Sequence, residues 1–219
     1  MITLHTYYRS SAAYRVRIAL QLKGLAYTSI PVHLLQDGGE QHTPAYVDIN
    51  PSQLVPTLVD GEMTLGQSMA IMEYLDETYP AAPLLPADAP GRAWVRSVSQ
   101  LIACDIHPLN NLRVLQYLEQ VLAVDATARK AWYQHWVVTG FDALERMLQA
   151  RKTAGDFCAG AAPGMADCCL VPQLYNARRF KVPLQAYPTL CRIEAACLGL
   201  EAFQKAAPEQ QPDAPHLKT

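Results

Sequence analysis

The sequence predicts an α+β domain followed by an all-helical domain. Strand and helix patterns alternate over residues 1–82, whereas every periodic segment after residue 91 has the three-and-four spacing of a helix. Between them, residues 83–90 combine three prolines with small side chains, which is typical of a rigid connector. We therefore expect domains at 1–82 and 91–219, joined by a linker at 83–90.

The first half of the N-terminal domain predicts two strands around one helix. Residues 2–6 alternate apolar and polar side chains, and apolar positions over residues 11–23 then predict a helix that Gly24 ends. Residues 27–32 predict a second strand, which Pro31 places at a sheet edge. Residues 35–49 predict a loop with at most a short helix.

The second half of this domain predicts a hairpin and a helix. Two apolar runs meet at Asp60 and Gly61, a strong hairpin signal. A helix opening at Ser68 and ending near Tyr79 follows. The resulting order, β-α-β-(α)-β-β-α, predicts a parallel strand pair, an antiparallel hairpin and helices on the faces of the sheet.

The C-terminal domain is predicted to be helical over 93–122, 126–150, 165–180 and 189–206, with a break near His107 and Pro108. Residues 164–167 indicate a helix start at which Asp167 supports folding by hydrogen bonding to the first turn. The last residues, 208–219, contain three prolines and are predicted to form a frayed tail.

Charge and cysteine content narrow the classes of partner. Lys and Arg number 18 against 20 Asp and Glu, so the sequence predicts neither a nucleic-acid nor a membrane-binding face, and we expect a small-molecule partner. No apolar run approaches the roughly 18 residues of a spanning helix, and no leader pattern opens the chain, so we expect a cytoplasmic protein. The six cysteines lack paired spacing, which favours buried, reduced thiols over disulfides or metal ligands.

Ser10 and Ser11 stand where the first predicted helix begins. Serine is a preferred N-cap, so helix capping alone would explain them. The same position also suits chemistry, because the N–H groups and positive dipole end of a helix favour an anion, and a thiolate is such an anion. Both interpretations stay open from the residues alone.

Several motifs, in order along the chain, resemble those of one enzyme family. They are Arg-Ser-Ser at 9–11, Tyr-Arg-Val-Arg-Ile-Ala-Leu at 14–20, Asn-Pro at 50–51, Leu-Val-Pro-Thr-Leu at 54–58, Gln-Ser at 67–68, Ala-Ile at 70–71, Asp-Ile-His-Pro-Leu-Asn-Asn at 105–111, Ala-Asp at 166–167, Val-Pro-Gln at 171–173 and Ala-Arg-Arg-Phe at 177–180. The chain resembles zeta-class glutathione S-transferases, which include maleylacetoacetate and maleylpyruvate isomerases. The resemblance implies a thioredoxin-like glutathione-binding domain, an all-helical substrate-pocket domain and a homodimer.

The resemblance also implies the site residues. The catalytic set is Ser10, Ser11 and Arg9. The glutathione-binding set is Ser10, Ser11, Arg15, Gln41, Val55, Pro56, Gln67, Ser68, His107, Asn111, Leu112 and Arg113. Val55 and Pro56 match a cis-proline junction, for which an ordinary trans bond is the alternative, and Ser68 could instead be a plain N-cap.

A dicarboxylate substrate needs cationic partners, and an arginine fork suits a carboxylate. We expect Arg9, Arg113 and Arg179 to bind the substrate, with solvated surface arginines as the alternative. The implied activity is glutathione-dependent cis–trans isomerisation of maleylacetoacetate or maleylpyruvate in aromatic catabolism. Alternatives are a general glutathione transferase, peroxidase or dehalogenase, and a non-enzymatic ligand-binding protein.

The sequence departs from the family pattern at one position. Ala12 stands where the family has cysteine after the two serines. A protein thiol therefore cannot assist beside the glutathione sulfur, which favours the maleylpyruvate-type relatives.

Overall fold

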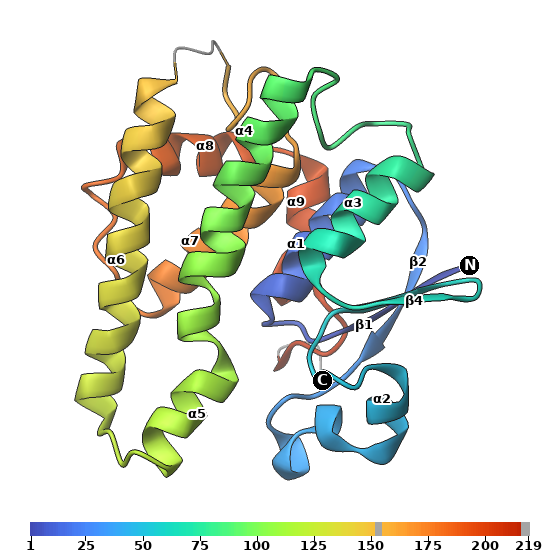
Figure 1. Cartoon of the computed structure of the whole chain (residues 1–219), viewed down its shortest axis with the longest axis vertical. Helices are drawn as coiled ribbons and strands as arrows, with labels where there is room; N and C mark the ends of the chain where they lie inside the picture. Colours follow the sequence, from blue (N-terminus) through green and yellow to red (C-terminus); the bar gives the residue numbers. More distant parts are fainter. Residues whose placement is uncertain (152–154, 216–219) are drawn as a thin grey trace. The chain divides into compact units, whose positions relative to one another are not determined.

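The computed structural model describes residues 1–151 and 155–215. The chain forms two compact units: Met1–Leu84 together with the segment from Leu198 onward, and Leu85–Cys197. Figure 1 labels most of their helices and strands. Among the described residues, no helix is both long and apolar enough to cross a membrane.

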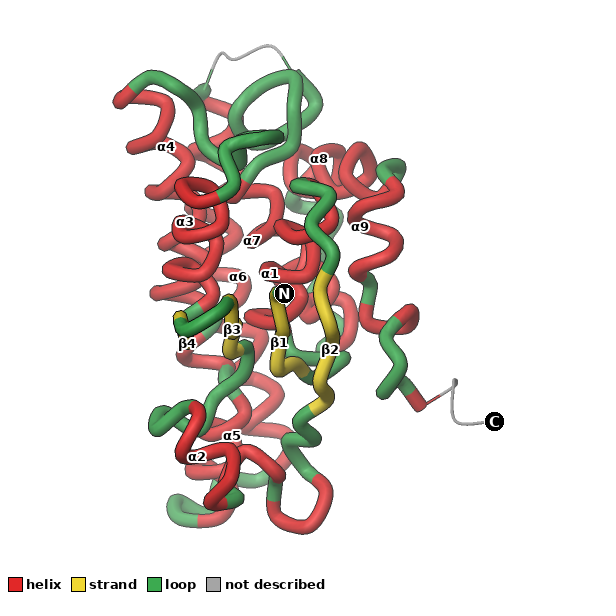
Figure 2. The backbone as a smooth tube through the Cα atoms, turned by 90° about the vertical axis from the view of Figure 1, so that its right-hand side faces the viewer, coloured by secondary structure: helices red, strands yellow, loops and turns green. Residues whose placement is uncertain are grey.

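The first unit contains a four-stranded sheet in the order β2-β1-β3-β4, as Figure 2 shows. The strands are β1 (Ile2–Thr6), β2 (Tyr27–Pro31), β3 (Thr57–Asp60) and β4 (Met63–Leu65). β1 pairs parallel with β2 and antiparallel with β3, and β3 forms a hairpin with β4. The predicted α+β topology is confirmed, and Pro31 lies in an edge strand as expected.

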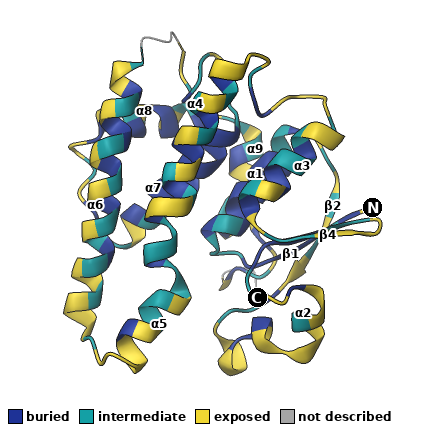
Figure 3. Cartoon of the chain, in the orientation of Figure 1, coloured by how far each residue is buried: buried dark blue, intermediate teal, exposed yellow. Residues whose placement is uncertain are grey.

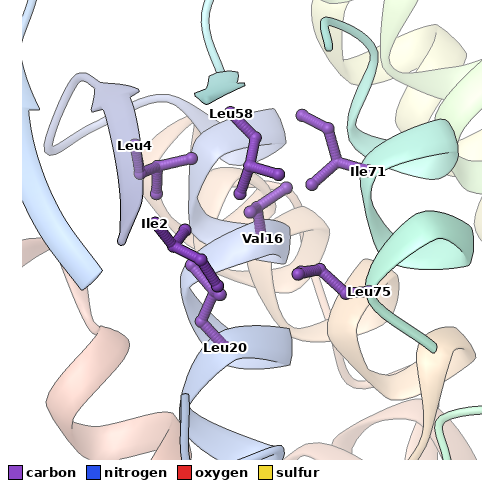
Figure 4. Packing of buried hydrophobic residues seen from close by; sticks show 7 residues of the cluster. All are labelled: Ile2, Leu4, Val16, Leu20, Leu58, Ile71 and Leu75. Carbon is purple, nitrogen blue, oxygen red and sulfur yellow. The ribbon is translucent and has the colours of Figure 1, made fainter. Parts of the chain in front are cut away.

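The helices of the first unit are α1 (Ser11–Leu22), α2 (Pro44–Ile49), α3 (Ser68–Thr78) and α9 (Glu201–Ala206). One face of the sheet packs on α1 and α3, and the apolar side chains between them form the core shown in Figure 4. Its buried members are Ile2, Leu4, Val16, Leu20, Leu58, Ile71 and Leu75. α9 packs against α1, so a segment from the end of the chain belongs to this unit.

The second unit is helical, and its most deeply buried helix is α7 (Met165–Arg179). The others are α4 (Ala89–Gln100), α5 (Leu112–Gln120), α6 (Ala126–Ala150) and α8 (Pro188–Leu198). A π-helix over Leu101–Ile106 and a 3-10 turn over Pro108–Asn110 connect α4 to α5. Figure 3 shows α7 buried over most of its length. Most of the side chains of this helix are apolar or small, on all of its sides, and they can therefore be buried.

Three expectations about the helices need correction. The first helix of the second unit begins at Ala89, within the predicted linker, because the Asp88 side chain caps it by accepting from Gly91 N. The π-helix was not predicted, since a template of 3.6 residues per turn cannot distinguish it. The segment 189–206 is two helices, α8 and α9, and the chain leaves the helical conformation at Leu200.

The prediction of a frayed tail is wrong for residues 208–215. Pro208, Gln211 and Ala214 are buried, and the Asp213 carboxylate accepts a hydrogen bond from the backbone of Tyr8. Residues 216–219 lie outside the described residues. The cysteines are free thiols as predicted, and four of them are buried, but Cys104 is exposed and Cys191 is half-buried.

Asp167 has the folding role that the sequence predicts. Its buried carboxylate accepts from the backbone N–H groups of Gly164 and Cys158, each at 2.9 Å. These bonds hold the start of α7 against the loop that precedes it.

Candidate functional site

Ser10 is the N-cap of α1. Its Oγ accepts a hydrogen bond from Ala13 N at 3.2 Å, so the capping interpretation is confirmed. A hydroxyl that accepts one bond still carries its own hydrogen, which can be donated to another group. Capping and anion binding are therefore compatible at this position, because the cap points the hydroxyl at the positive end of the helix.

Arg9 and Ser11 flank the cap. The Arg9 guanidinium lies 5.7 Å from the centroid of the Tyr8 ring, and Ser11 is the buried first residue of α1. Tyr7, in the same loop, is a further titratable group. Burial raises its pKa to about 12, so the phenol stays protonated at neutral pH and cannot act as a base there.

The start of α3 supplies the second set of predicted residues. Gln67 occupies the N-cap position with φ 64° and ψ 110°, a sparsely populated conformation for a side-chain-bearing residue. Ser68 is the first helical residue, so the alternative that it is a plain N-cap is wrong. Its Oγ accepts from Arg15 Nη1 at 3.1 Å, which joins α3 to α1.

The Val55–Pro56 peptide bond is cis, as the resemblance predicts. Two side chains hold the backbone around it. Asn50 Nδ2 and the Tyr46 hydroxyl donate to Leu54 O at 2.9 and 2.7 Å, and both also lie 2.9 Å from Thr57 Oγ1. Sequence reasoning assigned no role to these two residues, although the Asn-Pro motif at 50–51 marked the position of the first.

Gln41 lies in a 3-10 turn over Glu40–His42 and is 5% exposed. Its Nε2 donates to Leu34 O at 3.4 Å and lies 3.0 Å from His42 Nε2. Within residues 1–151 and 155–215, its buried Oε1 has no hydrogen-bond partner. A buried acceptor of this kind suits an N–H group of a ligand, because leaving it unpaired is costly.

The second unit carries the remaining predicted residues on two segments. His107 follows the π-helix, and its Nε2 lies 3.5 Å from Asn111 Nδ2. Asn111 caps α5 by accepting from Arg113 N at 3.2 Å, and Leu112 is the first residue of that helix. The structure therefore places these four predicted residues at the two ends of the 3-10 turn Pro108–Asn110, with His107 before it and residues 111–113 after it.

The arginines of the second unit differ in their surroundings. Arg113 and Arg179 are exposed, and the Arg179 guanidinium lies 5.0 Å from the centroid of the Phe180 ring. Its neighbour Arg178 is instead paired with Glu194. Two cationic groups thus end α7, and Glu194 forms an ion pair with the Arg178 guanidinium.

Four of the six thiols of the protein are poor nucleophiles. Burial raises the pKa of Cys158, Cys168, Cys191 and Cys197, which keeps them protonated. At the start of α1, where an anion is best stabilised, the chain has Ala12. An external thiol is therefore the better candidate for a thiolate at this helix.

The first unit is a thioredoxin-like α+β domain with a serine at a helix start, and residues 4–83 match the family model described as glutathione S-transferase, N-terminal domain. A probable maleylacetoacetate isomerase of Vibrio cholerae serotype O1 is 53% identical over 97% of this chain and 98% of its own length.

Two solved structures share the whole fold. The holo structure of a maleylpyruvate isomerase, a bacterial zeta-class glutathione S-transferase, has a TM-score of 0.94 and 46% identity, covering 97% of this chain and 99% of that one. A maleylacetoacetate isomerase of Methylobacterium extorquens AM1, with bound malonate and glutathione, has a TM-score of 0.93 and 40% identity at the same coverage. The chain belongs to the zeta-class glutathione S-transferase family.

Proposed function

We propose that this chain is a glutathione-dependent cis–trans isomerase of maleylacetoacetate or maleylpyruvate. The observation that carries the proposal is the position of Ser10, whose hydroxyl caps α1 and stands at the positive end of the helix. Similarity to isomerases of both substrates over nearly the whole chain supports it. The solved relative that holds glutathione together with malonate supports a thiol cofactor and a dicarboxylate substrate.

The residues of the first unit fit glutathione. The buried Gln41 Oε1 suits an N–H group, and the start of α3 offers backbone N–H groups to a carboxylate at Gln67 and Ser68. Val55 offers its backbone beside the cis bond. We assign further glutathione contacts to His107, Asn111, Leu112 and Arg113. The proposal also keeps a glutathione domain at 1–82 and a substrate domain that begins at residue 91, whereas the predicted end of that domain at 219 is replaced by Cys197, because the segment from Leu198 onward belongs to the first unit.

When bound, glutathione supplies a thiolate that adds reversibly to an activated carbon–carbon double bond and so permits rotation about it. The Ser10 hydroxyl donates a hydrogen bond to the sulfur, and the N–H groups of the first turn of α1 favour its negative charge. Ser11 supports the same helix start. Arg9, Arg113 and Arg179 hold the carboxylates of the substrate, for which a guanidinium fork is well suited.

The test follows the ultraviolet absorbance of maleylpyruvate and of maleylacetoacetate, with and without catalytic glutathione, while free thiol is measured in the same samples. Turnover with constant thiol supports the isomerase and identifies its better substrate. Thiol that falls in step with product would instead indicate a transferase, peroxidase or dehalogenase. A chain that binds glutathione and transforms neither acid would be a ligand-binding relative.

Two further properties belong to the proposal. We expect a homodimer, as the family implies, which sedimentation equilibrium would test directly. We also expect a cytoplasmic location, which fractionation of the source cells would test.

A further inference from the structure

The peptide backbone of Tyr8 is held from both sides. Its N–H donates to Asp213 Oδ2 at 2.8 Å, and its carbonyl accepts from Arg17 Nη2 at 2.9 Å. Tyr8 lies in the turn that leads to Ser10, whose own N–H donates to Tyr7 O at 2.9 Å. The N–H and the carbonyl of Tyr8, which belong to two successive peptide units, therefore set the path of the chain into the start of α1.

Arg17 is fully buried and acts as the centre of this arrangement. Besides Tyr8, it donates to Thr6 Oγ1 at 3.1 Å, to Tyr7 O at 3.3 Å and to Ala206 O at 3.0 Å. Burial lowers its pKa to about 10, so the guanidinium remains a cation at neutral pH. Its partners lie in β1, in the loop before α1 and at the end of α9.

Asp213 supplies a negative charge close to this cation. The charge of the carboxylate raises the pKa of Arg17, opposing the effect of burial. Because a buried cation is costly unless it is compensated, the carboxylate stabilises the charged guanidinium as well as the Tyr8 N–H. The pair thus acts on one short loop from opposite sides.

The segment that carries Asp213 is itself held in place. Gln211 Nε2 donates to Lys205 O at 3.1 Å and to Ala207 O at 2.9 Å, and Ala214 N donates to Gln211 O at 2.9 Å. Ala214 is fully buried. These contacts fix the turn on α9, so the carboxylate is presented in a defined position.

We propose that Asp213 is a positioning residue for Ser10, acting through the Tyr8 peptide and Arg17. The inference rests on the proposed function, because it assigns to the C-terminal segment a part in holding the thiolate-stabilising helix start. Without the carboxylate, the Tyr8 N–H loses its acceptor and Arg17 loses one of the two carboxylates, Asp213 and Glu209, that favour its charge, so the loop before Ser10 can move. The expected consequence is a weaker bond from Ser10 to the bound sulfur.

The experiment compares Asp213→Ala with Asp213→Asn, whose amide oxygen can still accept from Tyr8. Asp48→Ala, an exposed aspartate of α2, removes the same charge elsewhere in the first unit. The main readout is the pH titration of the thiolate absorbance of bound glutathione, which needs no turnover. The others are kcat and KM in the isomerase assay and the temperature of unfolding.

For Asp213→Ala we expect the pKa of the bound thiol to rise and kcat/KM at neutral pH to fall about tenfold, mainly through kcat. The kcat/KM of Asp213→Asn should lie within about threefold of that of the natural protein, since the hydrogen bond from Tyr8 N–H is retained. Asp48→Ala should match the natural protein in every readout. If Asp213→Ala does not fold, Asp213→Leu, which is close to aspartate in size and also lacks the acceptor for Tyr8 N–H, takes its place in the thiolate titration.

Two results would overturn the inference: a bound-thiol titration for Asp213→Ala that matches Asp48→Ala, or a folded Asp213→Asn that loses as much as Asp213→Ala. Failure of the proposed function is separate. A natural protein that binds glutathione as thiolate but isomerises neither acid would contradict the proposed activity alone, and the thiolate titration would still decide the role of Asp213. A natural protein that does not bind glutathione would overturn both.

Discussion

Arg15 donates a hydrogen bond from Nη1 to Ser68 Oγ across 3.1 Å, which joins the N-terminal half of α1 to the start of α3. Both side chains are buried, at 2% and 6% exposed. At the start of each of these helices the first backbone N–H groups have no carbonyl of their own helix to donate to, and such a helix start favours an anion. The bond therefore fixes the separation of two anion-binding ends within the first unit, which a ligand with both a thiolate and a carboxylate requires.

Replacing Ser68 by Ala should weaken glutathione binding more than catalysis. The change removes one acceptor from the buried Arg15 guanidinium, and we expect KM for glutathione to rise about tenfold while kcat stays within about twofold. Steady-state kinetics with glutathione varied measures both. Ser99→Ala is the control, because Ser99 is also buried but donates to its own helix at Val95 O. Equal KM values for the two variants would contradict the assignment.

Replacing Ser10 by Ala should lower both the stability of the protein and its catalytic rate, because Ser10 caps α1 and is proposed to donate to the sulfur. Loss of the cap destabilises the protein by about 1 kcal/mol. Loss of the donor to sulfur should also lower kcat by about 10²-fold, as for other donors to a developing anion. Asp125→Ala removes an equivalent cap, since Asp125 Oδ1 accepts from Ala128 N in α6. It should lose the same stability without loss of activity. A similar kcat for the two variants would show that Ser10 acts only as a helix cap.

The fold was predictable because most elements carry a local signal. Alternation and the Asp60–Gly61 turn predicted the sheet, and the helical spacing over 126–150 predicted α6 with the observed bounds. The π-helix Leu101–Ile106 has no such signal, because its apolar pattern also fits an α-helix. The prolines at 208, 212 and 215 suggested a frayed tail, whereas long-range contacts hold the described part of that segment.

The site, like the fold, could be predicted only where the residues near each other in the sequence carry a signal. Ser10 was a candidate because it stands where a helix is predicted to begin, and Gln67 and Ser68 were candidates because of the resemblance to the family. Asp213 was not, because its partner Tyr8 lies 205 residues away and no local pattern joins the two. Supporting contacts of this kind depend on tertiary structure, so they are the part of a site that a single sequence conceals.

Replacing Arg9 or Arg179 by Ala should raise KM for the dicarboxylate substrate. Loss of a charge-assisted hydrogen bond predicts an effect of about tenfold or more on kcat/KM. The measurement varies the acid at saturating glutathione. Arg178→Ala is a matched control one residue from Arg179, because Arg178 is paired with Glu194. It should change stability and leave KM for the acid unaltered. An unchanged KM in both test variants would exclude these arginines from the substrate site.

Replacing Tyr7 by Phe should leave the pH profile unchanged below pH 10. Burial raises the pKa of the phenol from 10.0 to about 12, so it is protonated throughout the range of the assay. Because the folded-state pKa lies above the unfolded value, this group stabilises the fold below pH 10 and loses that contribution as pH rises toward 12. Profiles of kcat/KM from pH 6 to pH 9.5 test the first statement. A shifted limb in the variant would make Tyr7 part of the acid–base chemistry.

Replacing Gly140 by Ala should disturb the segment that carries His107. A Cβ at Gly140 in α6 would lie 2.3 Å from both Cγ1 and Cδ1 of Ile106, the last residue of the π-helix. Alanine normally stabilises a helix interior by about 1 kcal/mol relative to glycine. Here overpacking should reverse the sign and cost about 1–3 kcal/mol, which chemical denaturation would measure.

The variant Ile106→Ala tests whether the close contact with Ile106 causes the loss of stability in Gly140→Ala. It removes the two clashing carbons and leaves Cβ of residue 106 at 3.6 Å from the new methyl group, an ordinary contact. Alone, it should destabilise by about 2–5 kcal/mol through the cavity it leaves. Combined with Gly140→Ala, the loss should be smaller than the sum, because the added methyl group fills part of that cavity. If the losses of unfolding free energy in the two single variants add up to that of the double variant, the close contact between Gly140 and Ile106 does not require glycine. If His107 contacts glutathione as proposed, KM for glutathione should rise in Gly140→Ala and recover in the double variant. These KM values test the contact between residues 140 and 106 independently of the stability measurements.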